Sequence, residues 1–274
     1  METELRLLWV AIVAYVLSGS VAIFGLVLKR RPERFVLTAM AGGLLFHVAA
    51  IALRWDRLGH GPFVTLFEIL SSNVWSLTLI YCLAYWRYRA VRPAAAFVMP
   101  LLFVLMGWLM LSSPEEGHFP VTYRTPWLYI HVGLSKVFLG CVLIALGMAI
   151  VVLLRRRGIA LARLAGIPAD GRLDDLAYRF MALGLVFQSL MLVSGAIWAQ
   201  DAWGRYWAWD PLETWSFVTW LLLAFALHLR LTLRTTAPTG AWMIVAVFGL
   251  AFLTFFGVPF VTTYHGIYNA KSPL

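Results

Sequence analysis

The chain has 274 residues, of which 62% are hydrophobic and only 13% are charged, and its mean hydropathy is +0.82. Soluble domains average about 25% charged residues, so this composition excludes a globular domain with one anchor and indicates a protein that crosses a membrane several times. The formal net charge of +9 needs no nucleic acid partner, because the basic residues follow a topological pattern.

Eight apolar runs are long enough to span a bilayer at about 20 residues per helix. In chain order they cover residues 7–28, 35–55, 66–86, 94–112, 127–154, 177–197, 215–233 and 241–262. The first run is long and precedes the basic segment Lys29–Arg34, which is typical of a retained span and not of a cleaved signal peptide. We therefore expect an all-α polytopic membrane protein in which residues 1–274 form a single transmembrane domain.

The basic residues predict the orientation of these spans. Most of the 22 Lys and Arg residues lie in the connections after the first, third, fifth and seventh spans. Basic loops stay on the cytoplasmic side, so both termini are expected on the outer face of the cytoplasmic membrane. The two cysteines, Cys82 and Cys141, lie inside spans and form no CxxC, which excludes a dithiol redox carrier.

Three helix starts carry capping signals. Thr65 and Glu68 have the spacing of a capping box at the third span, and Thr125 precedes a first-turn proline at the fifth. At the seventh span Asp210 is followed by Pro211 and, three residues on, by Glu213. The simplest role of Asp210 is therefore to start a helix.

The most informative segment is the Trp-rich connection of residues 198–215, expected on the outer side. Six of the chain's 13 tryptophans fall within residues 198–220. Tryptophan collects at membrane interfaces, and Trp203, Tyr206, Trp207 and Asp210 have the spacing of one face of a short interfacial helix. The alternative is a stacking surface for a large flat ligand, formed by Trp203, Tyr206, Trp207 and Trp209, and spacing alone favours neither.

Two histidines favour the stacking surface. His131 is expected early in the fifth span and His265 after the eighth, at similar depth on the outer side. Two imidazoles that face each other across an aromatic floor suit axial ligation of haem iron. A lone histidine at an interface would more simply be a hydrogen-bonding residue, but this pair lies beside the Trp-rich segment.

The other histidines have separate interpretations. His228 is expected about 9 Å from the inner end of its span and His47 about 18 Å, so they are not expected to share one iron. A partner subunit is then the candidate source of the ligand trans to His228. His47 and His60 are further binding candidates, although for His60 and His118, both in outer loops, a solvated histidine is the simpler interpretation.

Several motifs together resemble the CcsA (ResC-type) cytochrome c assembly proteins, the haem-handling family with the "WWD" signature. They are Leu173–Arg179, Ser194–Ala199, Ala202–Trp215, Leu227–Arg230, Gly59–Pro62 with Glu68, and the late His265. The chain departs from the family pattern at Leu212, where lysine is usual, and around His265, which lies in Thr-Tyr-His-Gly-Ile-Tyr and not in the common Leu-His-Ser-Tyr.

The resemblance implies a subunit of a system II cytochrome c synthase of the haem-lyase type, with b-type haem as its substrate. Haem would move through the membrane to the outer Trp-rich site, where His131 and His265 are the axial ligands, for attachment to the CxxCH motif of an apocytochrome c. His228 would ligate an inner haem together with a CcsB/ResB-like membrane protein. A thioredoxin-like reductant is implied as a further partner, besides membrane lipid, and no side chain is assigned as a catalytic acid or base.

Two alternatives stay open. The first is a haem exporter subunit of the CcmC kind, which delivers haem to a chaperone; the eight spans, Glu213–Trp215 and His228 argue against it. The second is a structural or ion-translocating membrane subunit. That function needs acidic groups inside the spans, where Glu68 is the only one and its cap explains it.

Overall fold

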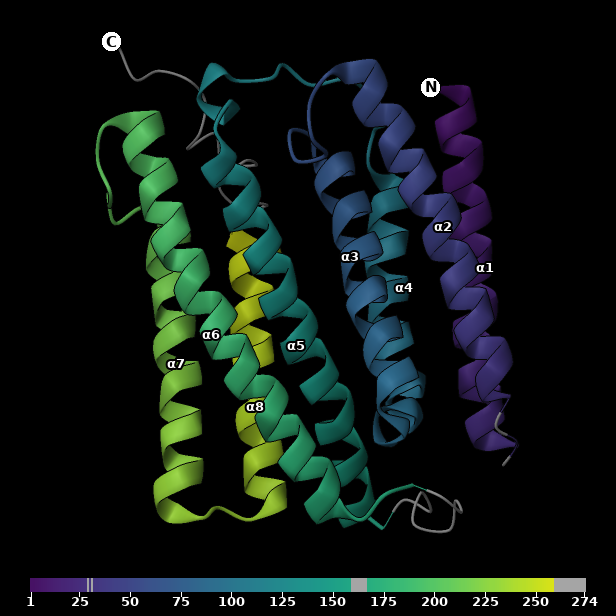
Figure 1. Ribbon diagram of the computed structural model, residues 1–274. Helices are drawn as coiled ribbons and strands as arrows, with labels where there is room; N and C mark the ends of the chain where they lie inside the picture. The colour runs from purple at the N-terminus through teal and green to yellow at the C-terminus, as the bar shows by residue number, and fades with distance from the viewer. Residues whose placement is uncertain (29, 31, 159–166, 259–274) are drawn as a thin grey trace.

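The protein is a bundle of long helices (Figure 1), seen in a computed structural model that describes residues 1–28, 30, 32–158 and 167–258. Eight helices within these residues are long and apolar enough to cross a membrane. The expected all-α polytopic fold is therefore confirmed.

Each expected span corresponds to one helix. The helices are α1 (Glu2–Val27), α2 (Glu33–Leu58), α3 (Leu66–Arg87), α4 (Ala95–Leu111), α5 (Pro126–Arg156), α6 (Asp170–Trp203), α7 (Pro211–Leu233) and α8 (Ala237–Phe252). Short 3-10 helices precede α4 (η1, Arg89–Ala94) and α5 (η2, Val121–Tyr123), and a π-helical turn (Leu253–Gly257) continues α8. The largest difference is α6, which has 34 residues and extends beyond both ends of the expected 177–197 run because its polar ends are also helical.

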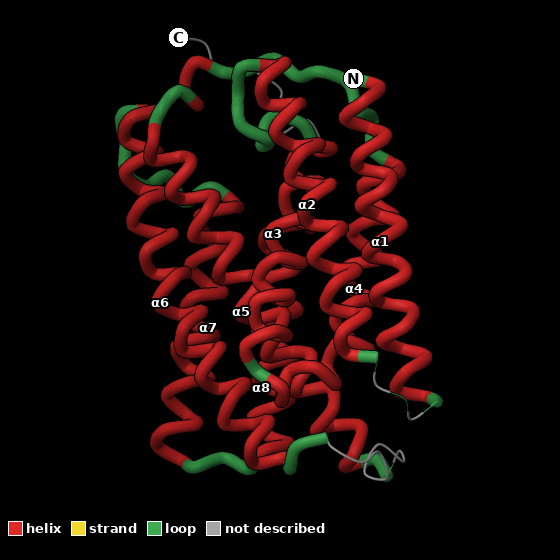
Figure 2. Tube along the Cα trace, turned by 45° about the vertical axis from the view of Figure 1, so that its right-hand side comes forward, coloured by secondary structure: helices red, strands yellow, loops and turns green. Residues whose placement is uncertain are grey.

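The up-and-down path of the chain separates two ends of the bundle. The α2–α3, α4–α5 and α6–α7 connections lie at the end that carries Met1, here called the N-terminal end (Figures 1 and 2). The helix ends rich in arginine, at Arg87, Arg155–Arg157 and Arg230–Arg234, lie at the opposite end. This separation matches the alternation of basic connections in the sequence.

Helix α5 is the centre of the bundle, with α3, α6 and α8 packed around it. Every residue from Phe138 to Ala149 is buried. In the N-terminal half of α5 the surroundings are more open, because residues 129–137 are exposed or half-buried with the exception of Ser135. The candidate site residue His131 lies in this open half.

The three capping predictions are confirmed. Thr65 accepts a hydrogen bond from the backbone N–H of Glu68, and the Glu68 carboxylate accepts one from that of Thr65. The Thr125 hydroxyl accepts from the Trp127 N–H at 3.3 Å, and Asp210 accepts from the Glu213 N–H at 2.9 Å. These caps fix where α3, α5 and α7 begin at the N-terminal end.

Glu68 does more than cap α3. The expectation that capping alone explains this buried carboxylate is therefore corrected. Glu68 is 1% exposed and accepts a hydrogen bond from Arg54 Nε at 3.0 Å. Arg54, which is 6% exposed, also donates to Glu4 at 3.4 Å and to the backbone oxygens of Pro114 and Glu115 at 3.0 and 3.1 Å. This buried ion cluster of Glu4, Arg54 and Glu68 therefore joins α1, α2 and α3 to the α4–α5 connection.

Candidate functional site

The Trp-rich segment consists of two helix ends and a short connection. Helix α6 continues to Trp203 and stops at Gly204, whose φ of 71° is the left-handed conformation that ends many helices. Residues 204–210 are irregular, and α7 begins at Pro211. The interpretation of Trp203 to Asp210 as one short interfacial helix is therefore wrong.

The connection is held by the first turn of α7. The Glu213 carboxylate accepts the Ala208 N–H at 2.7 Å, and the Thr214 hydroxyl donates to the Trp209 carbonyl at 3.2 Å. Trp209 has a φ of 58°, an uncommon conformation for a residue with a Cβ and one that persists only where the surroundings impose it. Trp209 and Tyr206 nevertheless stay 67% and 61% exposed, so a fixed backbone presents large aromatic surfaces.

The aromatic rings fall into two groups at the N-terminal end. The His131 cluster contains His131, Tyr123, Trp198 and Trp203, with Trp198 in contact with each of the other three at centroid distances of 4.9 to 6.3 Å. The loop cluster contains Trp207, Trp209, Phe217 and Trp220, whose ring centroids lie 5.6 to 6.4 Å apart. The sequence did not show that the tryptophans divide between the end of α6 and the connection that leads into α7.

The orientation of His131 leaves one ring nitrogen available. Its Nδ1 lies 2.8 Å from the carbonyl oxygen of Met191 on α6, and because a carbonyl only accepts, Nδ1 carries the proton. The neutral imidazole then has an unprotonated Nε2, and no described residue forms a hydrogen bond with it. A histidine held by a carbonyl at one nitrogen has the arrangement of a metal ligand at the other.

Helix α6 is shaped to receive this imidazole. A Cβ at Gly195 would lie 2.6 Å from Nδ1 and 2.8 Å from Cε1 of His131, so only glycine allows this approach. The Ser194 hydroxyl donates to the same Met191 carbonyl at 3.1 Å, and Trp198 stacks on the imidazole with 27° between the planes. The Ser194–Trp198 motif thus forms the seat of His131, a role that the sequence did not reveal.

His60 is buried, and the interpretation of it as a solvated loop histidine is wrong. It is 6% exposed and stacks on Phe119 with 4.9 Å between centroids and 7° between planes. Its Nδ1 donates to the Gly61 carbonyl at 3.0 Å. Phe119 in turn contacts Tyr123 of the His131 cluster, because the α4–α5 connection lies against the α2–α3 loop. Tyr123 is itself buried enough to raise its pKa.

The remaining histidines lie apart from the His131 cluster. His47 is fully buried on α2 with both ring nitrogens occupied, Nε2 at 3.0 Å from the Ser71 hydroxyl and Nδ1 at 3.4 Å from that of Tyr15. His228 is exposed on α7, which packs on α6 and α8, whereas α2 packs on α1 and α3. His118 is exposed in the α4–α5 connection, as expected of a solvated loop histidine, and His265 lies outside the described residues.

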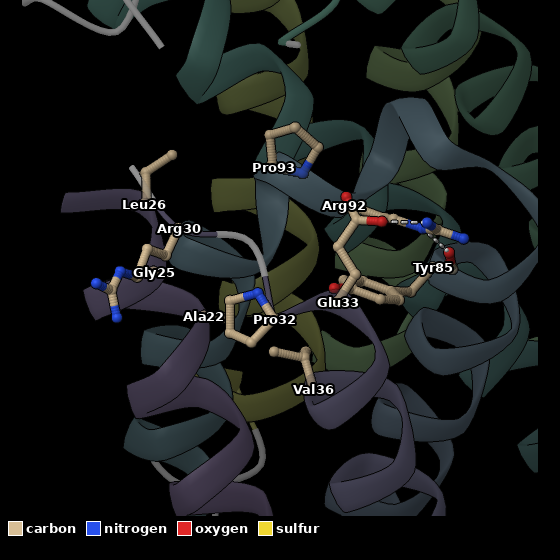
Figure 3. A pocket seen from close by; sticks show the side chains of 10 residues that line it. All are labelled: Ala22, Gly25, Leu26, Arg30, Pro32, Glu33, Val36, Tyr85, Arg92 and Pro93. Carbon is tan, nitrogen blue, oxygen red and sulfur yellow. Dashed lines mark hydrogen bonds and ion pairs between the residues drawn. The ribbon is translucent and has the colours of Figure 1, made fainter. Parts of the chain in front are cut away.

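A pocket at the opposite end of the bundle has a different character. It lies between α1, α2, α3 and η1 (Figure 3) and is lined by Ala22, Gly25, Leu26, Arg30, Pro32, Glu33, Val36, Tyr85, Arg92 and Pro93. Arg92 forms an ion pair with Glu33 and donates to the Tyr85 carbonyl at 3.1 Å. Because no histidine or cysteine lines it, this pocket is not the candidate site.

Comparisons with known proteins agree with the motifs. Residues 63–265 match the sequence profile of a family described as Cytochrome C assembly protein. A cytochrome c biogenesis protein CcsA from Parasynechococcus marenigrum (strain WH8102) is 32% identical over 243 residues, which cover 78% of each chain. Another from Chlamydomonas reinhardtii is 29% identical over 78% of this chain, which spans only 63% of that protein.

The fold also matches a solved structure. Cytochrome c Heme Lyase CcmF superposes with a TM-score of 0.73 over 97% of this chain and 50% of its own, at 19% sequence identity. This chain therefore corresponds to about half of that larger protein.

Proposed function

Because the chain belongs to the cytochrome c assembly protein family, we propose that it binds haem and presents it for covalent attachment to an apocytochrome c. The observation that carries this proposal is the seat of His131. Its Nδ1–H is fixed by Met191, its Nε2 has no hydrogen bond to a described residue, and Trp198 stacks on the ring. Such an imidazole fits an axial ligand of haem iron, since haem ligands need a set tautomer and orientation.

His265 is the proposed second axial ligand. The resemblance to the family assigns it this role, and the residue follows α8, which packs on α5. A porphyrin held between His131 and His265 would meet the exposed rings of Trp203, Tyr206 and Trp209, with the half-buried Trp207 behind them. Large aromatic side chains provide the flat apolar contact that a porphyrin face needs. Asp210 serves the site as the cap of α7.

The reaction proposed for the bound haem is addition of two cysteine thiols of a CxxCH motif across its two vinyl groups. Each addition forms one carbon–sulfur bond and transfers the thiol proton to carbon, so no electrons are needed. The protein would act by holding the vinyl edge near the incoming thiols, which is catalysis by positioning. A thioredoxin-like protein would keep the cysteines reduced beforehand.

A second haem position is proposed at His228. This histidine is exposed on α7 together with Leu221 and Phe225, on a face that no described helix covers. An ionisable side chain that faces the membrane is costly unless a partner receives it. We expect that partner to be a CcsB/ResB-like membrane protein, which would provide the ligand trans to His228.

The proposed orientation places the N-terminal end of the bundle on the outer face of the cytoplasmic membrane. Arginines cluster at the opposite end, as the positive-inside rule requires for a cytoplasmic face. The His131 cluster would then be open to apocytochromes that have already crossed the membrane.

The proposed function is tested by purifying the protein with and without a co-expressed CcsB/ResB-like partner. We expect a Soret band in the preparation with the partner, and thioether-linked haem on a CxxCH peptide added under reducing conditions. Transfer of haem to a chaperone and not to the peptide would indicate an exporter. Absence of a Soret band in every preparation would contradict haem handling altogether.

Substitution Gly195→Val should release His131 from its seat. The valine side chain would occupy the space of the imidazole edge, break the bond to Met191 and lower haem retention by roughly 10-fold or more, the usual cost of losing such a supporting contact. The measurement is Soret absorbance per protein after purification. Gly249→Val on α8 is the matched control, because a Cβ there meets nothing within 4 Å. Equal losses of haem in both variants would contradict the role of Gly195 in holding His131.

A further inference from the structure

A lysine inside the bundle has no acidic partner among the described residues. Lys136 on α5 donates to the Ser72 hydroxyl at 2.9 Å and to the Asn73 carbonyl oxygen at 2.8 Å, both on α3. None of the ion pairs formed by the described residues includes it. A charge within a span is expensive and marks a functional position by default.

The lysine cluster consists of Ser72, Asn73 and Lys136. It retains N–H donors that could bind an anion. A lysine ammonium has three N–H donors, and only two of them have partners within the described part of the chain. The Asn73 amide oxygen is used, whereas its NH₂ group, with two donors, has no hydrogen bond among the described residues. The free donors of the two side chains therefore match the two oxygens of a carboxylate.

The space beside Lys136 is open. Tyr129, Gly133 and Lys136 follow one another at spacings of four and three residues and so share one face of α5. Gly133 is exposed, and a Cβ built on it meets nothing within 4 Å. Further toward the N-terminal end, Tyr129 stacks with Trp55 at 5.9 Å and makes an edge contact with Phe63 at 4.9 Å. An aromatic rim thus borders an open space with a cation at its deeper end.

This face of α5 differs from the face that bears His131. His131 contacts Met191 and Gly195 of α6, whereas Lys136 contacts α3. Lys136 is five residues further along the helix, a rise of about 7.5 Å. The lysine cluster is therefore a position next to the iron-ligand site, deeper in the bundle, and not a part of the seat of His131.

We propose that the lysine cluster is a carboxylate-binding site for a propionate of haem, occupied while the porphyrin lies between α3 and α5. This inference rests on the proposed function, because it needs haem as the ligand. Haem combines a large apolar ring with two propionates, which matches an aromatic rim above a half-buried cation. A charged hydrogen bond in this setting also fixes which edge of the porphyrin enters first.

The test compares haem with haem dimethyl ester, in which both propionates are neutral. In titrations of the purified complex we expect the wild-type protein to bind haem roughly 10- to 100-fold more tightly than the ester, the range of a hydrogen bond to a charged group. Lys136→Met should lower affinity for haem and leave affinity for the ester nearly unchanged, so that the preference falls to about threefold or less.

Two further variants separate ligand binding from a purely structural tie between α3 and α5. Asn73→Asp provides an internal carboxylate that keeps Lys136 bound to α3 but competes with the propionate, so the preference for haem should be lost although the fold is kept. Lys136→Arg keeps the charge and should retain most of the preference.

The possible outcomes separate failure of the carboxylate site from failure of the proposed haem-handling function. Equal wild-type affinity for haem and ester, or an unchanged preference in Lys136→Met and Asn73→Asp, would overturn the lysine cluster as a carboxylate site and leave haem handling intact. If the wild-type complex binds neither porphyrin, the proposed function fails and the carboxylate site fails with it.

Discussion

Replacing His131 by alanine is expected to remove most of the haem that the protein retains during purification, a reduction of more than about tenfold. The imidazole is held from three sides, by the Met191 carbonyl, by Gly195 and by the stacked Trp198. His47 and His228 cannot take its place, because His47 has both nitrogens occupied and His228 lies on the outside of α7. The measurement is the Soret band per protein, together with the yield of thioether-linked cytochrome c.

The matched control is His118→Ala, which removes an exposed histidine from the α4–α5 connection at the same end of the bundle. Its haem content should equal that of the wild type. His131→Gly adds a sharper test, since it leaves a space that added imidazole can fill and should regain the wild-type spectrum. Unchanged haem content and an unchanged Soret maximum in His131→Ala would eliminate this residue as a ligand.

The helical bundle was predictable because a membrane-spanning helix requires a long apolar run in the sequence. A hydrocarbon core requires about 20 apolar residues per helix, so eight runs in the sequence became eight helices. The helix starts were predictable for a local reason, since Thr65, Thr125 and Asp210 lie within a few residues of the N–H groups that they cap. Helix ends interrupted by polar residues were missed, as in α6, whose last turns contain Gln200 and Asp201 between Trp198 and Trp203.

The site was predictable only in its residue types. Six tryptophans near two histidines indicated a flat metal-bearing ligand, but the contacts of His131 involve α6 residues 60 or more positions away. The burial of His60 depends on Phe119 from a different connection, which no local pattern reveals. Lys136 falls within the expected fifth span, and only the packing of α3 shows that its hydrogen-bond partners are neutral.

The same N-terminal end contains the contact on which the fold is expected to depend most. Arg54→Met should lower the free energy of unfolding by about 3–5 kcal/mol, because Glu68 would keep a buried negative charge with no cation beside it. Glu4 would still have a cation beside it, since Arg57 also binds it at 2.8 Å. The backbone oxygens of Pro114 and Glu115 would lose their donors as well. Thermal unfolding in detergent, followed by helix content, measures the effect.

A second substitution separates charge burial from loss of packing. In the double variant Arg54→Met/Glu68→Gln the buried charge is gone, so part of the lost stability should return, and the two changes should not be additive. Arg179→Ala is the matched control, because its ion pair with Asp175 is exposed on α6 and contributes only about 0.5 kcal/mol. If Arg54→Met unfolds at the same temperature as Arg179→Ala, the buried ion cluster does not hold α1, α2 and α3 to the connection that covers His60.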